Sequence, residues 1–267
     1  MLPDGELMTI DASVIEKGLR TLLLKPNVIV LDTVDSTNSY VRSLLARGLT
    51  DEIVVLADSQ HAGRGRQNRC WHSPLGGLYM SLTLKPRLPE SRVAMLGLLA
   101  GCAAADAIHQ MTGLDAGLKW PNDIMIREHK VGGILSEAVN ISDGTTIVIL
   151  GIGIDQNTRL EDMPAEFRDR TTTILTESGL ETSREELAYK IVNNIDARLA
   201  VLVSDSSPSS ILDEWMRVNV TIGKKVQVND GERVIRGVAV GITPTGSLRV
   251  KVGHRDIEIQ AGDVLQY

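Results

Sequence analysis

Apolar and polar positions divide residues 53–84 into two strand-like segments with a polar stretch between them. The run IVVL fills residues 53–56, and apolar side chains recur at every second position from Leu78 to Leu84. Such patterns predict β-strands over residues 53–57 and 77–84. A long loop inside a compact domain is usually functional or disordered, so the stretch between the two strands draws attention first.

The same reading gives the other elements of the chain. Apolar runs predict strands over residues 28–34, 129–139 and 147–154, and a strand after the turn at residues 121–123. Helical periodicity predicts a short helix within 12–24 and helices after Thr37, over 92–111, over 183–203 and over 211–218. Residues 156–182 are polar with weak periodicity and are expected to form a loosely ordered connection, and residues 204–210 a linker.

The pattern changes after Thr221, where short alternating strands are separated by Gly and Asn-Asp-Gly turns. Such spacing is typical of a small all-β barrel of about fifty residues. We therefore expect two domains, over residues 1–219 and 220–267.

Composition narrows the class of protein. The 267 residues are 43% hydrophobic with a net charge of −6, which is ordinary for a soluble globular protein and argues against a chain that binds nucleic acid as a whole. Cys70 and Cys102 are too few for a disulfide framework and lack metal-ligand spacing. The most apolar window, 93–108, contains Asp106 and is shorter than the ~20 residues of a membrane span. No secretory signal opens the chain, so a cytoplasmic location is expected.

The polar stretch between the first two strands carries the first candidate chemistry. Glycines allow the backbone to approach a ligand closely, and arginines can hold a phosphate or carboxylate with two hydrogen bonds. These residues predict an anion-binding loop, with an indole that could stack on a base, while a solvated basic hairpin loop explains them about equally well. The residues are Gly63, Arg64, Gly65, Arg66, Arg69 and Trp71.

Three other places carry polar groups beside strands, and each has a plainer explanation. Asp35 and the hydroxyls of Ser36 and Thr37 could bind polar ligand atoms, although a simple helix N-cap is the more common role. Lys119, Asn122 and Asp123 crowd charges as a metal–phosphate site would, although Pro-Asn-Asp also forms an ordinary turn. Lys130 precedes two strand glycines, which often mark close ligand approach, although a lone lysine there usually faces solvent.

Taken together, these motifs resemble a biotin–protein ligase. The segments are STN at 36–38, SQHAGRGRQNRCW at 59–71, KWPNDI at 119–124, KVGGIL at 130–135 and GIGID at 151–155. The resemblance implies an α+β fold: a central, mostly antiparallel mixed sheet with helices on one side, as in class II synthetases, and an SH3-like C-terminal barrel. It also implies a biotin–[acetyl-CoA-carboxylase] ligase, which makes biotinyl-AMP from biotin and ATP and transfers biotin to a lysine of a carboxylase's biotin carrier domain.

The resemblance assigns roles residue by residue. It implies that Lys130, Arg66 and Asp123 are catalytic, with Asp123 near Mg²⁺. It assigns biotin binding to Ser36, Thr37, Asn38, Gln60, Gly63, Arg64, Gly65, Arg66, Lys130, Gly132, Gly133, Gly151 and Gly153. It assigns ATP binding to Arg66, Arg69, Trp71, Lys119, Asn122 and Asp155.

Two positions depart from the family pattern. Asn68 stands where the family often has Gly, and Asn tolerates the left-handed backbone, so the loop is expected to fold. Asp155 stands where the family usually has Asn, which puts that ATP contact in doubt because an acid near phosphates needs a cation.

Rival functions are a lipoate–protein ligase, related in fold and chemistry, and a non-catalytic nucleic-acid or effector-binding module. The GRGR and KWPND motifs with the C-terminal barrel favour biotin, and the acidic balance argues against the module. About 25 residues precede the first strand, so no winged helix and no DNA binding are expected. No membrane partner is expected, and a homodimer is left open.

Overall fold

The computed structural model describes residues 9–85, 88, 93–141, 144–204, 209–231 and 233–266. The predicted start of the long helix at residue 92, and residues 205–208 of the predicted linker, lie outside this part of the chain. Within it, no helix is both long enough and apolar enough to cross a bilayer.

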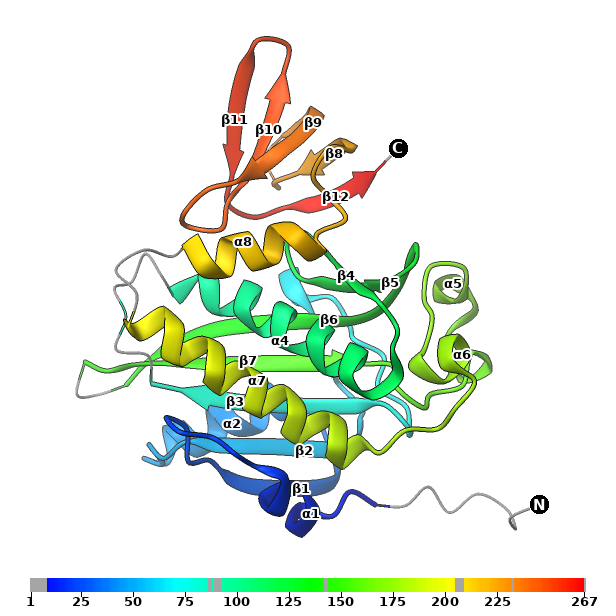
Figure 1. Cartoon of the computed structure of the whole chain (residues 1–267). Helices are drawn as coiled ribbons and strands as arrows, with labels where there is room; N and C mark the ends of the chain where they lie inside the picture. The colour runs from blue at the N-terminus through cyan, green and yellow to red at the C-terminus, as the bar shows by residue number, and fades with distance from the viewer. Residues whose placement is uncertain are drawn as a thin grey trace.

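A seven-stranded mixed sheet forms the centre of the molecule, in the order β1-β2-β3-β7-β6-β5-β4 (Figure 1). Only β1 and β2 pair in parallel, and the other neighbours are antiparallel, as the family resemblance implies. The strands are β1 (Asn27–Val34), β2 (Ile53–Gln60), β3 (Leu78–Leu84), β4 (Ala116–Lys119), β5 (Asp123–Ile126), β6 (His129–Asn140) and β7 (Thr146–Ile154).

Several helices cover one face of this sheet, and α2 (Thr37–Ala46) packs on the other (Figure 1). Because side chains alternate along a strand, Val54 and Leu56 face the large core under the helical layer, whereas Ile53 and Val55 face α2. The helical layer consists of α1 (Ala12–Gly18), α4 (Met95–Thr112), α7 (Arg184–Ser204) and α8 (Ser209–Val218). The predicted layer is therefore present, and α2 adds a partial layer opposite it.

The prediction of a loosely ordered connection over 156–182 is wrong. This segment contains η2 (Leu160–Asp162), α5 (Ala165–Arg168) and α6 (Ile174–Ser178). Backbone hydrogen bonds tie it to β6, since Lys130 N–H donates to Arg170 and Thr172 N–H donates to Lys130. Gln156 is fully buried and its amide donates to the Thr182 carbonyl. Polar contacts of this kind order a segment without producing any hydrophobic periodicity.

The C-terminal all-β unit is a five-stranded antiparallel sheet in the order β11-β10-β9-β8-β12. It is joined to the end of β4, because Trp120 N–H donates to Thr221 Oγ1 at 2.8 Å and Trp120 Nε1 donates to the Gly246 carbonyl at 2.9 Å. The KWPND segment therefore lies where the two sheets meet. The strands are β8 (Lys225–Asn229), β9 (Val234–Ile242), β10 (Leu248–Val252), β11 (Arg255–Ile259) and β12 (Asp263–Gln266).

One buried carboxylate fixes the chain between α1 and β1. Asp196 on α7 accepts hydrogen bonds from the backbone N–H groups of Leu22, Leu23 and Leu24, at 2.7–2.9 Å. Asp196→Ala is expected to lower the free energy of unfolding by about 3 kcal/mol, because hydrogen bonds to a charged group are lost and the buried Leu24 N–H is left unpaired. Urea denaturation measures this loss. Asp213→Ala, at an exposed helix position, is the control, and equal losses in both variants would contradict the argument.

Candidate functional site

A glycine-lined floor lies on the sheet face that carries α2. The register places Gly151 and Gly153 of β7 beside Gly133 of β6 on this face. A Cβ at Gly151 would lie 2.3 Å from Asn38 Oδ1, and one at Gly153 would lie 2.6 Å from Trp71 Nε1. Any larger residue would therefore displace α2 or the indole, so these glycines allow groups from two other segments to reach the sheet.

Gly132 does not belong to this floor. It alternates with Gly133, and a Cβ on it would meet the Gly153 carbonyl at 2.7 Å and the side chains of Ile154 and Ile124. Both side chains belong to the core under the helical layer. The structure thus places Gly132 on the opposite face of β6 from the other predicted biotin-site glycines.

The glycine-arginine segment folds back on itself as a hairpin. Trp71 N–H donates to the Gly63 carbonyl at 2.9 Å, and Gly65 N–H donates to Arg69 at 2.7 Å. A Cβ at Gly63 would lie 2.4 Å from the Trp71 carbonyl, which explains the glycine there. At the tip, η1 (Arg66–Asn68) has Asn68 at φ +59°, the left-handed backbone that Asn tolerates, and the loop folds as expected.

The start of α2 presents polar groups to the floor. Ser36 is the N-cap by position, but its side chain makes no capping hydrogen bond, so the hydroxyl is not used as a simple cap. Thr37 N–H donates to Gln60 Oε1 at 2.9 Å, and Gln60 Nε2 donates to Ser73 Oγ at 2.8 Å. Asn38 is buried and lies 2.6 Å from the Ser81 hydroxyl. The four predicted side chains Ser36, Thr37, Asn38 and Gln60 therefore lie together.

Positive charge gathers at the other end of the floor. Lys130 Nζ lies 2.5 Å from Asp123 Oδ1 and 5.1 Å from the centroid of the Trp71 ring. Arg66 donates to Asn122 Oδ1 at 3.4 Å. Burial lowers the pKa of Arg66, with Asp263 and Asp123 opposing the shift, and the guanidinium stays charged. The cations thus face a region partly removed from water, where they attract an anion most strongly.

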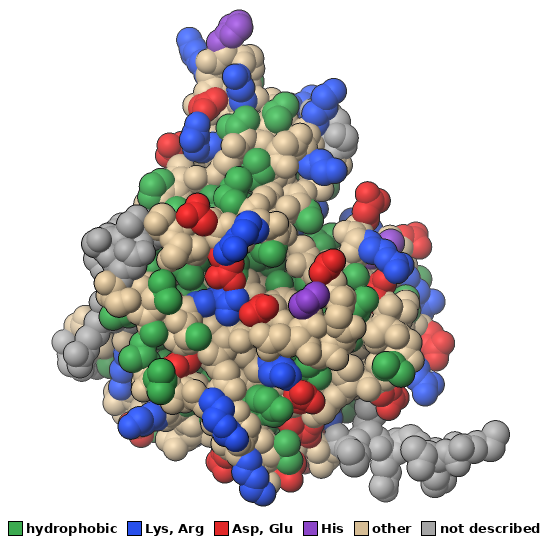
Figure 2. Space-filling model, in the orientation of Figure 1, with side chains coloured by type: hydrophobic (Ala, Val, Ile, Leu, Met, Phe, Trp, Pro, Cys, Tyr) green, Lys and Arg blue, Asp and Glu red, His purple; other side chains and the backbone are tan. Residues whose placement is uncertain are grey.

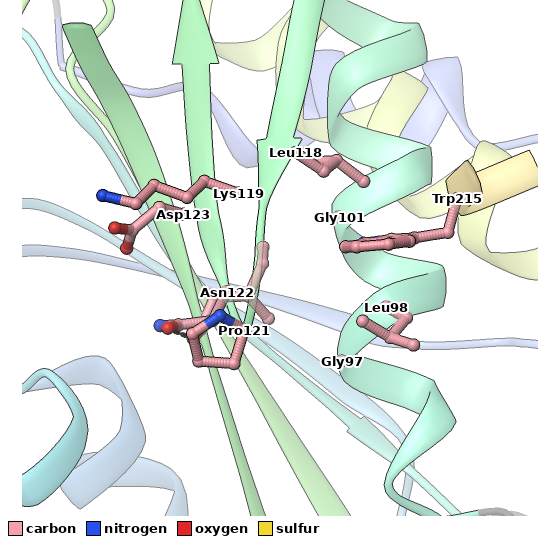
Figure 3. Close-up of a pocket in the computed structure, with 10 residues that line it drawn as sticks. Gly97, Leu98, Gly101, Leu118, Lys119, Pro121, Asn122, Asp123 and Trp215 are labelled. Carbon is pink, nitrogen blue, oxygen red and sulfur yellow. Dashed lines mark hydrogen bonds between the residues drawn. The ribbon is translucent and has the colours of Figure 1, made fainter. Parts of the chain in front are cut away.

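Figure 3 shows that side chains in and next to the KWPND segment point in two opposite directions. Lys119 and Asp123 project from the strands away from α4, whereas Leu118 points toward α4 and Trp215 of α8. The cavity between these two groups is only about 10 Å³, too small for a nucleotide. Ligand chemistry therefore belongs to the open face on which Lys119 and Asp123 project. Arg69 lies at the same end and is paired with Asp263 of β12.

Asp155 is placed differently from the other predicted ATP residues. Its side chain is buried, and Oδ1 has no hydrogen-bond partner among the described residues. Burial raises the pKa of Asp155 well above its usual range, and the charge of Lys130 opposes this shift only partly. Asp155 therefore lies under the site, where burial favours its protonated form, and is not an exposed ligand group.

This burial predicts a pH-dependent gain in stability for Asp155→Asn. Because the pKa of Asp155 is higher in the folded protein than in the unfolded chain, the wild type loses stability as pH rises above the unfolded pKa of 3.8 toward the raised folded value. Asn does not titrate. The variant is expected to be about 1–3 kcal/mol more stable at pH 8, the usual cost of an unsatisfied buried polar group, with a gain that shrinks toward pH 5.

Thermal unfolding at pH 5 and pH 8 measures the effect, at about 2–4 °C in Tm per kcal/mol. Asp58→Asn is the matched control, because Asp58 is equally buried but is paired with Arg184 at 2.8 Å. That variant is expected to lose stability at both pH values. An Asp155→Asn protein with no gain at pH 8 would contradict the account.

Sequence reasoning missed several residues of the site. Glu137 accepts hydrogen bonds from Asn38 and Arg42, and Arg64 lies 3.5 Å from it. Ser81 lies under α2 with its hydroxyl toward Asn38. A signal was present for Glu137, because it lies four positions after Gly133 in a predicted strand and therefore shares its face.

The described side chains of the site are poorly suited to hold a metal ion. The described residues contain no group of three or more His, Cys, Asp or Glu side chains that could hold a metal ion. Asp123, the predicted Mg²⁺ residue, is already paired with Lys130. Any divalent ion needed here would have to be held mainly by the substrate's own phosphates.

Comparisons with known proteins find similarity to biotin and lipoate protein ligases. Residues 30–155 match the Biotin/lipoate A/B protein ligase family, and residues 221–265 match the Biotin protein ligase C terminal domain. The chain is 32% identical to the Bifunctional ligase/repressor BirA of Bacillus spizizenii, over 94% of this chain and 78% of that one. It is 30% identical to the Biotin--[acetyl-CoA-carboxylase] ligase of Mycobacterium tuberculosis, over 88% of each.

A solved structure extends the likeness to the fold. The biotin protein ligase from Aquifex aeolicus in complex with biotin and ATP is 32% identical to this chain, with a TM-score of 0.78 over 90% of this chain and 98% of that one.

Proposed function

Because this chain belongs to the biotin protein ligase family, we propose that it joins biotin to ATP and then transfers biotin to a lysine of a carboxylase's biotin carrier domain. The observation that carries the proposal is that the glycine-lined floor has neutral polar groups at one end and positively charged groups at the other. One end presents neutral polar groups from α2 and Gln60, and the other presents Lys130 and Arg66. A ligand with a polar ring at one end and a carboxylate at the other fits this arrangement.

The first step forms a bond from an oxygen of biotin's carboxylate to the α-phosphorus of ATP. The bond to the bridging oxygen breaks, and pyrophosphate leaves. A carboxylate is already a nucleophile, so no base is needed, and the enzyme's task is to position crowded anions and balance their charge. Lys130 and Arg66 supply that charge. Mg²⁺ enters with ATP as part of the substrate, coordinated by its phosphates.

In the second step, the amine of the carrier lysine attacks the carbonyl of biotinyl-AMP. An amide forms, the carbon–oxygen bond to the phosphate breaks, and AMP leaves while the amine loses its proton. Trp71 and the hairpin shield the mixed anhydride from water until the carrier lysine arrives.

We also propose that the chain acts in the cytoplasm and does not bind operator DNA. On the helical face in Figure 2, acidic and basic side chains are interspersed and form no continuous basic stripe.

A lipoate–protein ligase is the second candidate, since the family matched by residues 30–155 includes both activities. The match of the C-terminal unit to a biotin-ligase domain and the names of the relatives favour biotin. Incubation with Mg-ATP, a biotin carrier domain and either biotin or lipoate tests the choice. The carrier domain is expected to be acylated in the incubation with biotin and not in the incubation with lipoate. Transfer of lipoate but not of biotin would overturn the proposal.

A further inference from the structure

Glu177 of α6 is a buried carboxylate that takes no direct part in the proposed chemistry. Its side chain is 8% exposed. Oε1 accepts the hydroxyl proton of Thr172 at 2.7 Å, and Oε2 lies 3.1 Å from Nη1 of Arg127 in the turn between β5 and β6. Thr172 is buried, whereas the Arg127 side chain is 75% exposed, so the bond to Thr172 is the stronger of the two contacts. The helix itself is anchored to the sheet, because the Ile174 N–H donates to the Asp155 carbonyl at 2.9 Å.

Thr172 connects Glu177 to the backbone of Lys130. The Thr172 N–H donates to the Lys130 carbonyl at 2.8 Å, and the Lys130 N–H donates to the Arg170 carbonyl at 2.9 Å. These two bonds form an isolated parallel bridge, so no extended ladder holds residues 170–172 beside β6. The hydrogen bond from the Thr172 hydroxyl to Glu177 therefore fastens this short segment to α6.

Lys130 needs this hold because it lies beside a β-bulge. Adjacent residues of β5 pair with Gly132 and Lys130 of β6, so the pairing skips Val131. A bulge interrupts the ladder and re-aims a side chain. Here it directs Lys130 to the open face, where Cε lies 3.6 Å from the position of a Cβ on Gly133 and Nζ pairs with Asp123. The direction of the ammonium thus depends on a backbone that β5 supports only in part.

Resting on the proposed function, we propose that Glu177 is a positioning residue for the formation of biotinyl-AMP. Through Thr172 it fastens the segment that supports the bulge, and the bulge aims the Lys130 ammonium at the α-phosphate. Glu177 itself does not touch the ligand. A displacement of about 1 Å in a group that balances charge in the transition state slows the chemical step. The polar groups proposed for biotin's ring lie at the other end of the floor, so affinity for biotin should be kept.

Single-turnover release of pyrophosphate by the full chain, with saturating biotin and Mg-ATP, tests the inference. Thr172→Val removes the hydroxyl at nearly constant size and is expected to slow release about tenfold or more. The Kd for biotin, from titration calorimetry, should change less than about twofold, a split that general damage to the fold would not produce. Thr172→Ser keeps the hydroxyl and should retain most of the rate. Arg127→Ala is the matched control, because it removes the exposed partner of the same carboxylate, and it should stay within about twofold.

A double-mutant cycle tests whether the loss passes through Lys130. Glu177→Ala should slow release as much as Thr172→Val does, and neither change should slow the Lys130→Ala protein further by more than about twofold, because the group that they position is absent. Fully additive losses would overturn the inference. If Glu177→Ala does not fold, Thr172→Val replaces it in the cycle with the same expectation. An unchanged rate in Thr172→Val would overturn the inference alone, whereas a wild type without biotin-dependent release would overturn the proposed function and the inference with it.

Discussion

Replacing Lys130 with alanine is expected to slow formation of the adenylate by about 10²-fold or more, the usual effect of removing one charge-stabilising group. Lys130 Nζ lies 2.5 Å from Asp123, and the backbone of Lys130 is held on both sides by residues 170 and 172. The ammonium is therefore held at the position where the proposed mechanism needs positive charge beside the α-phosphate. The substitution also takes away the ammonium that is paired with Asp123 beside the incoming phosphates, which adds repulsion.

Single-turnover release of pyrophosphate measures this rate, and titration with biotin alone should show a much smaller effect. Lys130→Ala/Asp123→Asn is expected to recover part of the lost rate, because the repelling carboxylate is gone. Lys190→Ala, which removes a surface lysine paired with Glu186, serves as the control and should stay within about twofold. A near-normal rate in Lys130→Ala would rule out this role for the residue.

Replacing Arg66 with glycine is expected to release the reactive intermediate. Arg66 lies at the tip of the hairpin, is partly buried and donates to Asn122, so it can bridge the hairpin and the KWPND segment over a bound phosphate. A charge-assisted hydrogen bond contributes about 1.5–3 kcal/mol. Its loss corresponds to roughly ten- to a hundredfold faster escape of biotinyl-AMP. Because a mixed anhydride acylates free amines, the variant should label lysines on unrelated proteins.

The measurement is incubation with biotin, Mg-ATP and serum albumin, followed by streptavidin blotting. Arg249→Ala is the control, since Arg249 is an exposed strand arginine paired with Asp256 in the C-terminal sheet. It should label albumin no more than the wild type does. Equal labelling by Arg66→Gly and wild type, with adenylate formation intact in both, would show that Arg66 does not retain the intermediate.

Local pattern was sufficient to predict the strands of this fold, whereas their arrangement in a mostly antiparallel mixed sheet followed only from the family resemblance. A period of two identifies β2, β3 and β7, and the glycines at 151 and 153 mark the face that must stay open. These features depend on neighbours in sequence, which is why they could be read from it. The side chain of Lys130 could not be placed in this way, because strict alternation puts it on the face of Gly132, and a register shift between β5 and β6 brings it beside Gly133.

Contacts between distant segments could not be read in this way. Glu137 meets Asn38 and Arg42 across 99 and 95 residues, and Arg69 meets Asp263 across 194. Hydrophobic periodicity says which face a residue occupies, but it does not say which polar groups from other segments meet there. For the same reason, the connection over 156–182 looked unstructured, although buried polar contacts order it.

The exchange of labelled pyrophosphate into ATP tests the central claim most directly, because it reports the first chemical step without any carrier protein. The wild type is expected to catalyse exchange when biotin is present, not when lipoate replaces it, and Lys130→Ala should lose most of that exchange. Exchange that does not depend on biotin, or that proceeds equally well with lipoate, would contradict the account.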